Sequence, residues 1–187
     1  MKEALTNKFL FIGCVVIIGI FLIVKMMPPI ALFCPVKMVL TKQIGNIVTL
    51  DDTRKADFTR NFVVPTILFP EGEELYHPVL GYFGYKYNFF MDFTVNMDVK
   101  KEGYYHFIVG SDDGFRLHID SNILGEFTNN RSFSLNDMMV YLNKGKHQVL
   151  LNYFQGFGRQ GLTAYYQYDE QPKKYLVGKS SSYIRFF

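Results

Sequence analysis

Two adjacent carboxylates in a glycine-terminated turn carry the clearest chemical signal in this chain of 187 residues. Asp112 and Asp113 stand side by side and are followed by Gly114. Neighbouring carboxylates repel each other unless a cation or several N–H donors hold them. Gly114 is expected to have the positive φ that lets the backbone reverse sharply. The turn therefore predicts either part of a metal site or an acidic turn whose carboxylates accept backbone hydrogen bonds.

The residues on either side of this turn alternate as they do in half-buried strands. Tyr105, Phe107 and Val109 lie on one face before the turn, and Leu117 and Ile119 repeat the pattern after it. Successive side chains of a strand point to opposite faces of the sheet, so this alternation indicates one buried face. The two carboxylates are therefore predicted to lie in the connection between two strands.

These segments resemble the protective-antigen domain family, a β-sandwich found in a bacterial toxin's protective antigen, in yeast flocculins and in many glycosidases. The family pattern is a G-x-Y-x-F strand, a Ser-Asp-Asp-Gly turn, an Arg-Leu-x-Ile-Asp strand and, later, a Gly-x-His-x-hydrophobic strand that ends in Tyr. The match runs from about Tyr82 to Tyr168, under half of the chain. It implies an all-β fold, an antiparallel β-sandwich. The matching segments are 103–107, 111–114, 116–120 and 145–153.

The resemblance also implies a calcium site. In sugar-binding members the two aspartates are joined by a cis peptide bond and coordinate calcium, which in turn holds sugar hydroxyls; here these are Asp112 and Asp113. Calcium takes about six to eight oxygen ligands, so a second loop must supply more donors. By their reach along the chain, Asn129 and Asn130 or the loop 156–161, with Arg159 near its tip, are the candidates.

The segment 156–161 spells G-x-G-x-x-G, but it does not predict a dinucleotide site. That motif must leave a strand and open a helix, with the pyrophosphate at the helix N-terminus. Here it separates two predicted strands, 148–154 and 162–167. We expect a glycine-rich hairpin loop instead.

No catalytic arrangement is visible in the sequence. The histidines lack metal-ligand spacing, and no Ser–His–Asp order stands out. A glycosidase needs two carboxyls across a cleft, not two neighbours in one turn. His147 matches the family's structural histidine, His106 and His118 are expected on outer strand faces, and Asp120 is expected to cap a hairpin turn. We therefore predict that the chain is not an enzyme.

Composition places the chain among globular proteins and argues against nucleic-acid binding. Hydrophobic residues make up 49% and charged residues 20% of the chain, which includes 19 Phe and 13 Tyr but no Trp. Aromatic residues suit strands and are mostly expected in the core. The net charge of +3 is small, and no basic cluster is interleaved with aromatics. The two cysteines, Cys14 and Cys34, precede the β-domain and provide no disulfide framework.

An uncharged apolar run over residues 9–24, which Met26 and Met27 extend past a snorkelling Lys25, predicts a transmembrane anchor over residues 9–27. Lys2 and Lys8 precede the run, so the tip 1–8 should stay in the cytoplasm and the rest should be exported. A cleaved signal peptide is the first alternative, but the run is long and no small-x-small site follows it. A lipoprotein signal at Cys14 is the second, although the apolar run continues past that cysteine. The predicted location is a single-pass inner-membrane protein with a periplasmic C-terminal domain.

Four further segments complete the predicted organisation. Prolines break the chain after the anchor, and residues 28–61 are expected to form a neck with possible edge strands, its polar part 51–60 being a loop or short helix. The sandwich is predicted over 62–170. The tail 171–187 ends in apolar residues and is expected to cover a sheet edge, bind a partner by adding a strand, or remain loose.

Two functions fit these observations. The first is a membrane-anchored, non-catalytic module that binds glycan or peptidoglycan through the Asp112-Asp113 loop with calcium. The second is a structural subunit of an envelope-spanning complex, such as a motor or secretion machine, that acts by contacts with other envelope proteins. The second rests on the small domain, the membrane tether and the surplus of aromatic residues.

Overall fold

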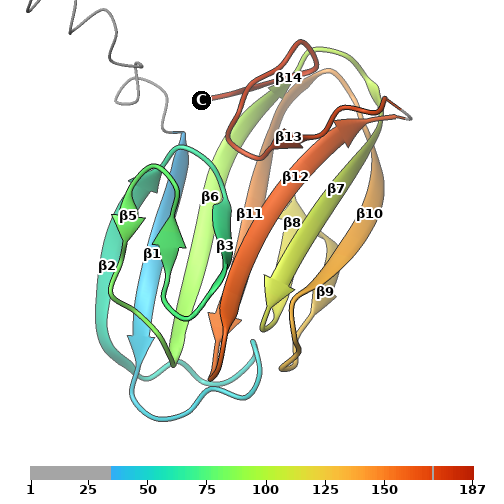
Figure 1. The fold of residues 1–187 in the computed structure, drawn as a ribbon. Coiled ribbons are helices and arrows are strands. Elements are labelled where there is room, and N and C mark those ends of the chain that lie inside the picture. The colour runs from blue at the N-terminus through green and yellow to red at the C-terminus, as the bar shows by residue number, and fades with distance from the viewer. Residues whose placement is uncertain (1–34, 170) are drawn as a thin grey trace, which may run out of the picture. The chain divides into compact units, whose positions relative to one another are not determined.

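Two packed antiparallel β-sheets and a separate two-stranded hairpin make up the part of the chain that the structure describes (Figure 1). A computed structural model describes residues 35–169 and 171–187. The predicted all-β sandwich is confirmed there. The predicted tip 1–8 and transmembrane segment 9–27 lie outside the described residues, and within the described ones no helix has the length and apolarity needed to cross a bilayer.

The larger sheet has seven strands, which come from both ends of the described chain, from β1 near its start to β14 near its end. Its central strands are β6 and β11, which pair along their whole lengths. In spatial order the strands are β2 (Ala56–Val64), β1 (Val36–Gln43), β6 (Phe89–Val99), β11 (Gly145–Gln155), β8 (Phe115–Ile119) and β9 (Asn122–Phe127), with β14 (Ile184–Phe186) also paired to β6.

The smaller sheet has five strands and covers the inner face of the first. A separate two-stranded hairpin joins β4 (Tyr76–His77) to β5 (Gly81–Tyr82). The five strands, in spatial order, are β10 (Ser134–Leu142), β7 (Gly103–Asp112), β12 (Gln160–Tyr168) and β13 (Tyr175–Leu176), with β3 (Leu68–Gly72) also paired to β12.

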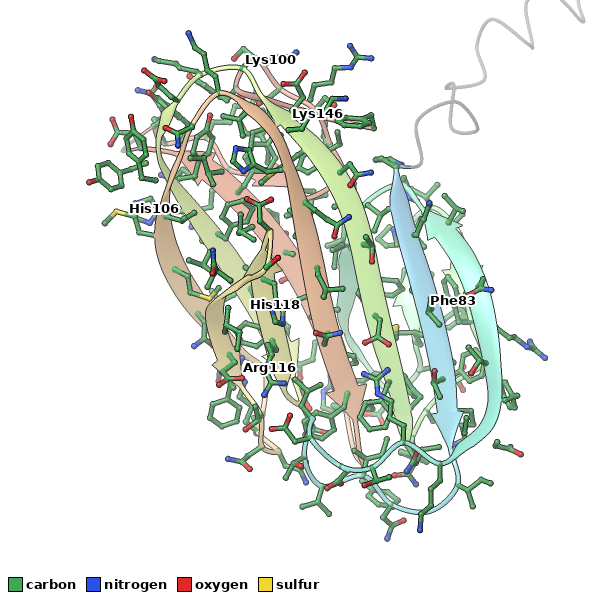
Figure 2. The ribbon with its side chains drawn as sticks, turned by 180° about the vertical axis from the view of Figure 1, so that it is seen from behind. Phe83, Lys100, His106, Arg116, His118 and Lys146 are labelled. Carbon is green, nitrogen blue, oxygen red and sulfur yellow. The ribbon has the colours of Figure 1, made fainter. Side chains whose placement is uncertain are left out.

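Aromatic side chains fill the space between the sheets, as their abundance predicts. Phe93 and Tyr153 from the larger sheet and Tyr105, Phe107 and Tyr166 from the smaller one are at most 1% exposed. Such rings bury large apolar areas and prefer tilted or edge-on contacts, which several pairs in this core show. The outer face of the larger sheet is polar, and Arg116, His118 and Lys146 lie there (Figure 2).

The sandwich begins earlier than the predicted residue 62. β1 is not an edge strand of a neck, because it lies between β2 and β6 and its residues Val36, Met38 and Leu40 are fully buried. β2 replaces the second half, residues 56–60, of the loop or helix expected over 51–60. It pairs on one side only and is largely exposed, so its polar sequence has little of the alternation that identifies a strand.

The sandwich also ends later than the predicted residue 170. β13 pairs with β12, and β14 pairs with β6 at the end that β1 leaves uncovered. Val177 and Ile184 are at most 1% exposed. The tail therefore covers a sheet edge, as one of the three expectations had it, because its apolar residues add to the same core.

Candidate functional site

The Asp112-Asp113 turn passes from one sheet to the other. Asp112 is the last residue of β7 in the smaller sheet, and β8 in the larger sheet begins at Phe115. The two strands flanking the turn are thus not paired with each other, and the carboxylates lie at the rim where the sheets meet. The peptide bond between Asp112 and Asp113 is cis, as the family resemblance implies.

Asp113 holds two neighbouring loops with its carboxylate. Its Oδ2 accepts the backbone N–H of Gly156 at 2.8 Å, and its Oδ1 accepts the backbone N–H of Arg131 at 3.3 Å. The first donor belongs to the β11–β12 loop and the second to the β9–β10 loop. Both loops that the sequence offered as partners of the turn are therefore joined to it by one side chain. The predicted acidic turn with backbone donors describes Asp113 correctly.

Asp112 is buried with less compensation, because one backbone donor, that of Phe133, lowers the pKa of its carboxyl. It is 7% exposed, and its backbone carbonyl accepts the hydroxyl of the fully buried Tyr153. Burial, followed by the charges of Asp113 and Glu71, raises the pKa of Asp112 to about 6. Burial also raises the pKa of Asp113, against the two backbone donors that lower it. Two neighbouring carboxyls whose ionised forms are disfavoured present a place where a bound cation is stabilising.

Gly114 does not have the positive φ that the sequence suggested. Its need for glycine is steric, because a Cβ at this position would lie 2.5 Å from the backbone oxygen of Phe127 and 2.5 Å from Cε1 of Phe154. The backbone of the acidic turn thus runs directly against the end of β9 and the end of β11. The close approach is what brings Asp113 within reach of both loops.

Of the two predicted asparagines, Asn130 places its side chain beside Gly156, the residue whose N–H binds Asp113. Its Oδ1 lies 3.7 Å from the point where a Cβ on Gly156 would stand, and Asp113 Oδ2 lies 3.4 Å from that point. The backbone oxygen of Ile47 is 2.7 Å from it. Asn129 takes part through its backbone, which bridges to Thr49. A carboxylate, an amide and a carbonyl oxygen therefore surround Gly156.

Arg159 lies on the β11–β12 loop, as predicted, and is held by two acidic side chains. Its Nε is 2.7 Å from Glu71 Oε1, and its Nη1 is 3.2 Å from Glu73 Oε1. Its charge also lowers the pKa of Asp112, although burial dominates that group. Arg159 therefore lies at the edge of the site and contacts the acidic residues around it.

Arg131 belongs to the site although no sequence pattern points to it. Its Nη2 donates to Ser111 Oγ at 2.7 Å and its Nη1 to Asn136 Oδ1 at 2.7 Å, while the guanidinium carbon stands 4.5 Å from the centre of the Phe127 ring. Ser111 Oγ in turn donates to the backbone oxygen of Asp113 at 2.7 Å. Arg131 thus holds the turn in two ways. Its side chain binds Ser111, which binds the backbone of Asp113, and its own backbone N–H binds the Asp113 carboxylate.

The donor set fits calcium in kind. Carboxylate, amide and carbonyl oxygens are the ligands that calcium prefers. Among residues 35–169 and 171–187 no group of three His, Cys, Asp or Glu side chains could hold a metal ion. A cation at this turn would therefore depend on Asp112 and Asp113 together with Asn130 and backbone carbonyls such as that of Ile47.

A second polar cluster stabilises the other end of β11. His147 Nδ1 is 2.9 Å from Asp120 Oδ2 and its Nε2 is 2.9 Å from the backbone oxygen of Asn143. Asp120 has a φ of 57° and also accepts the backbone N–H of Gln148 at 2.9 Å. Both ring nitrogens of His147 face acceptors, so the protonated ring, with two N–H donors, satisfies both contacts. His147 and Asp120 therefore hold the β8–β9 and β10–β11 turns together.

This cluster predicts a pH-dependent contribution to stability. Burial alone would lower the pKa of His147, but the hydrogen bonds to Asp120 and Asn143 outweigh it and raise the pKa. A raised folded-state pKa gives stability that is fully present below the ordinary value of about 6.5 and is lost as pH rises through the raised one. Urea unfolding should show wild type about 1 kcal/mol more stable than His147→Gln at acidic pH, with the difference shrinking in alkali. A difference that grows with pH would contradict this.

Comparison with known proteins identifies the fold. No family model and no curated protein matches the sequence. Among solved structures, the PA14 domain of the MpAFP antifreeze protein superposes with a TM-score of 0.63 at 14% identity, over 78% of this chain and 87% of that one. This chain has the PA14 fold. The resemblance to the protective-antigen domain is thereby confirmed at the level of the fold.

Two further PA14-fold structures are domains of adhesins. The PA14 sugar-binding domain of an RTX adhesin has a TM-score of 0.61 at 16% identity, over 76% of this chain and 93% of that one. The A domain of epithelial adhesin 9 from Candida glabrata, solved in complex with Galβ1-3GlcNAc, has a TM-score of 0.54 at 10% identity, over 79% of this chain and 91% of that one.

Proposed function

We propose that this PA14 domain is a non-catalytic glycan-binding module whose site is the Asp112-Asp113 turn loaded with calcium. The observation that carries the proposal is the turn itself: two buried carboxyls at the rim of the sandwich, with two loops fastened to Asp113. The adhesin domains that share the fold, one described as sugar-binding and one bound to a disaccharide, support the ligand class.

Each residue of the site would have a distinct part. Asp112 and Asp113 would hold the ion with Asn130 and the carbonyl of Ile47, and the bound calcium would supply open coordination positions for sugar hydroxyls. Asp113 also keeps the β9–β10 and β11–β12 loops at the turn through its two backbone hydrogen bonds. Arg131 positions the turn through Ser111.

The direct test is glycan capture by the full chain in calcium and in excess chelator. Glycan or peptidoglycan fragments immobilised on a sensor should bind the protein in calcium and release it in chelator. Equilibrium calcium titration of the same sample should show saturable binding. Absence of saturable calcium binding would remove the proposal.

The affinity for calcium should fall as the solution is acidified. The pKa of Asp112 is raised to about 6, so protons compete with the metal for this carboxylate. One unit below that pKa only about a tenth of the Asp112 carboxyls are ionised, and we expect calcium to bind about tenfold more weakly at pH ~5 than at pH ~7. Calorimetric titration across this range measures the change. An affinity that stays constant would exclude Asp112 as a ligand.

We also propose that residues 9–27 anchor the module in the cytoplasmic membrane and place the sandwich on its outer side. The charge-free run and the lysines before it support this topology. Alkaline phosphatase fused after residue 187 should be active in intact bacterial cells, since that enzyme matures only outside the cytoplasm. An inactive, stably expressed fusion would reverse the proposed orientation.

A second candidate function, a structural subunit of an envelope complex, is favoured by one surface. The outer face of the smaller sheet exposes four large apolar side chains: Tyr104 at 51%, Leu135 at 65%, Met139 at 59% and Tyr141 at 50%. Such a patch is typical of protein contact sites. Mild crosslinking in membranes followed by mass measurement should then capture envelope proteins, and replacing Met139 with lysine should abolish the capture. A strictly monomeric, uncrosslinked chain would argue against this function.

A further inference from the structure

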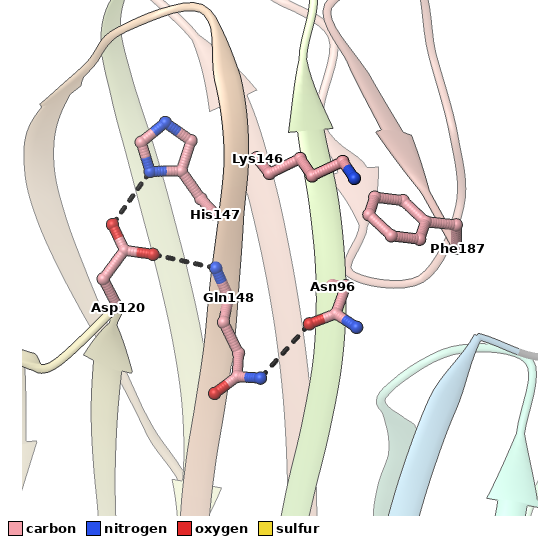
Figure 3. A pocket seen from close by; sticks show the side chains of 6 residues that line it. All are labelled: Asn96, Asp120, Lys146, His147, Gln148 and Phe187. Carbon is pink, nitrogen blue, oxygen red and sulfur yellow. Dashed lines mark hydrogen bonds and ion pairs between the residues drawn. The ribbon is translucent and has the colours of Figure 1, made fainter.

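A polar hollow lies at the start of β11 (Figure 3), and the acidic turn lies near the opposite end of that strand. The turn is fastened at Gly156, just past the other end of this strand. Eight residues separate Gln148 from Gly156, which corresponds to roughly 27 Å at the rise of an antiparallel strand. The hollow has a volume of about 400 Å³ and is lined by Asn96, Asp120, Lys146, His147, Gln148 and Phe187.

Two carboxamides form the floor of this hollow. Gln148 Nε2 donates to Asn96 Oδ1 at 3.2 Å, which orients both amides (Figure 3). Within the described residues, Asn96 Nδ2 and Gln148 Oε1 make no hydrogen bond. One end of the pair is thus a donor and the other an acceptor. Neighbouring sugar hydroxyls, which both donate and accept, match this arrangement.

An aromatic ring and an ammonium group border the amides. Phe187 is 47% exposed, and its backbone N–H donates to the Asn96 carbonyl at 3.1 Å, which places the residue beside β6. The Lys146 Nζ is 5.9 Å from the centre of the Phe187 ring. Among the salt bridges of the described residues, none involves Lys146. An exposed ring offers a flat apolar surface to the C–H face of a pyranose, and the ammonium can pair with an anion.

The remaining wall of the hollow consists of Asp120 and His147, whose side-chain polar atoms already have hydrogen-bond partners within the fold. Asp120 uses one oxygen for His147 and the other for the Gln148 backbone N–H. Both oxygens of the Asp120 carboxylate thus have a partner within the fold, and one of these partners is the His147 ring. Lys146 is the lysine among the residues that line the hollow.

We propose that this hollow is a second saccharide site, independent of calcium, that prefers sugars carrying a carboxylate. Asn96 and Gln148 bind adjacent hydroxyls, Phe187 packs against the sugar ring, and Lys146 pairs with the carboxylate. A few convergent polar groups around an apolar surface are the usual make-up of a small-ligand site. The site does not depend on the calcium-binding function, because it shares no residue with the acidic turn.

The experiment uses the full chain in a detergent without a sugar headgroup and with excess chelator present. The probes are a hyaluronan tetrasaccharide, which carries glucuronate, and the neutral tetramer of N-acetylglucosamine. Saturation-transfer NMR and sensor binding should show the acidic probe bound, and Gln148→Ala and Phe187→Ala should each weaken binding at least about tenfold. Lys146→Gln should reduce binding of the acidic probe to the level of the neutral one.

Matched variants separate this site from the acidic turn and from general damage. Thr94→Ala changes a residue two positions from Asn96 on the same face of β6, outside the hollow, and should leave binding intact. The double change Asp112→Asn, Asp113→Asn should also leave it intact, while removing calcium binding. No binding of the acidic probe in chelator, or binding insensitive to Gln148→Ala and Phe187→Ala in chains with wild-type circular dichroism, would overturn the proposal.

Discussion

Replacing Asp112 or Asp113 with asparagine should weaken calcium binding at least about 100-fold. Each change removes one of the two full negative charges at the turn and leaves a neutral oxygen in its place. At the loaded turn each carboxylate would be paired with the calcium ion. Removing one partner of a buried ion pair typically costs about 3–5 kcal/mol, and each 1.4 kcal/mol is about a factor of ten in affinity. Calorimetric titration of the full chain measures the loss. Asp137→Asn, which changes an exposed carboxylate on the outer face of the smaller sheet, is the matched control and should bind normally.

The same two variants should change the stability of the calcium-free protein to different extents. Asp112 has its pKa raised to about 6, so above that pH the folded protein carries a buried charge that the unfolded chain solvates. Asp112→Asn should therefore stabilise the fold at neutral pH by about 1–2 kcal/mol.

Asp113→Asn should stabilise the calcium-free protein less than Asp112→Asn does, because burial raises the pKa of Asp113 as well but its carboxylate accepts two backbone N–H groups. An amide cannot accept both backbone N–H groups, from Gly156 and Arg131, that the carboxylate accepts, so one donor is left unpaired. Urea unfolding in chelator compares both variants with wild type. Equal effects of the two changes would show that the two aspartates do not divide their roles as proposed.

The two strands and the acidic turn could be predicted because their information is local. Tyr105, Phe107 and Val109 alternate with period two, and β7 carries them on its buried face. β2 could not be predicted in the same way, because an edge strand with solvent around most of its side chains has no apolar alternation to detect. β14, with Ile184 and Phe186 buried, is only three residues long, and its pairing with β6 is a long-range contact.

The residues of the candidate site, too, could be predicted only where their signal is local in the sequence. Asp112 and Asp113 are visible in the sequence because the charges themselves are the signal. Asn130 was a candidate by reach alone, and its side chain, like that of Asp113, lies beside Gly156. The Ile47 carbonyl could not be predicted, since a backbone oxygen carries no sequence signal. Arg131 was missed because its role depends on Ser111 and on the ring of Phe127, which only the folded chain brings to it.

The hollow at the start of β11 shows why a binding site can escape sequence analysis altogether. Asp120 and His147 each had a structural interpretation that the fold bears out. The residues that could contact a ligand come from β6, β11 and the end of the tail, and only β14 brings Phe187 beside Asn96. A tail treated as separate from the sandwich cannot contribute to a site.

Gly114→Ala is expected to destabilise the protein by about 3 kcal/mol. The added Cβ would meet the Phe127 carbonyl and the Phe154 ring, both at 2.5 Å, and the Asn129 carbonyl at 3.1 Å. Two of these neighbours are backbone atoms that cannot move without shifting the strand end or loop that carries them. Overpacking of this kind costs about 1–3 kcal/mol and occasionally more. For a domain of this size the melting temperature should fall by about 10 °C.

Gly158→Ala is the control that separates the cost of steric overlap from the cost of an unfavourable backbone conformation. Gly158 has a φ of 87°, and no atom lies within 4 Å of the position that an alanine Cβ would take, so alanine there meets only the conformational cost of about 1–2 kcal/mol. Gly114 has no positive φ, so its cost arises from contact alone. Because the turn would have to move away from β9 and β11, Gly114→Ala should also weaken calcium binding, whereas Gly158→Ala should not. A Gly114→Ala variant with wild-type stability and calcium affinity would show that the close contact at the turn is not needed to hold Asp113 between its two loops.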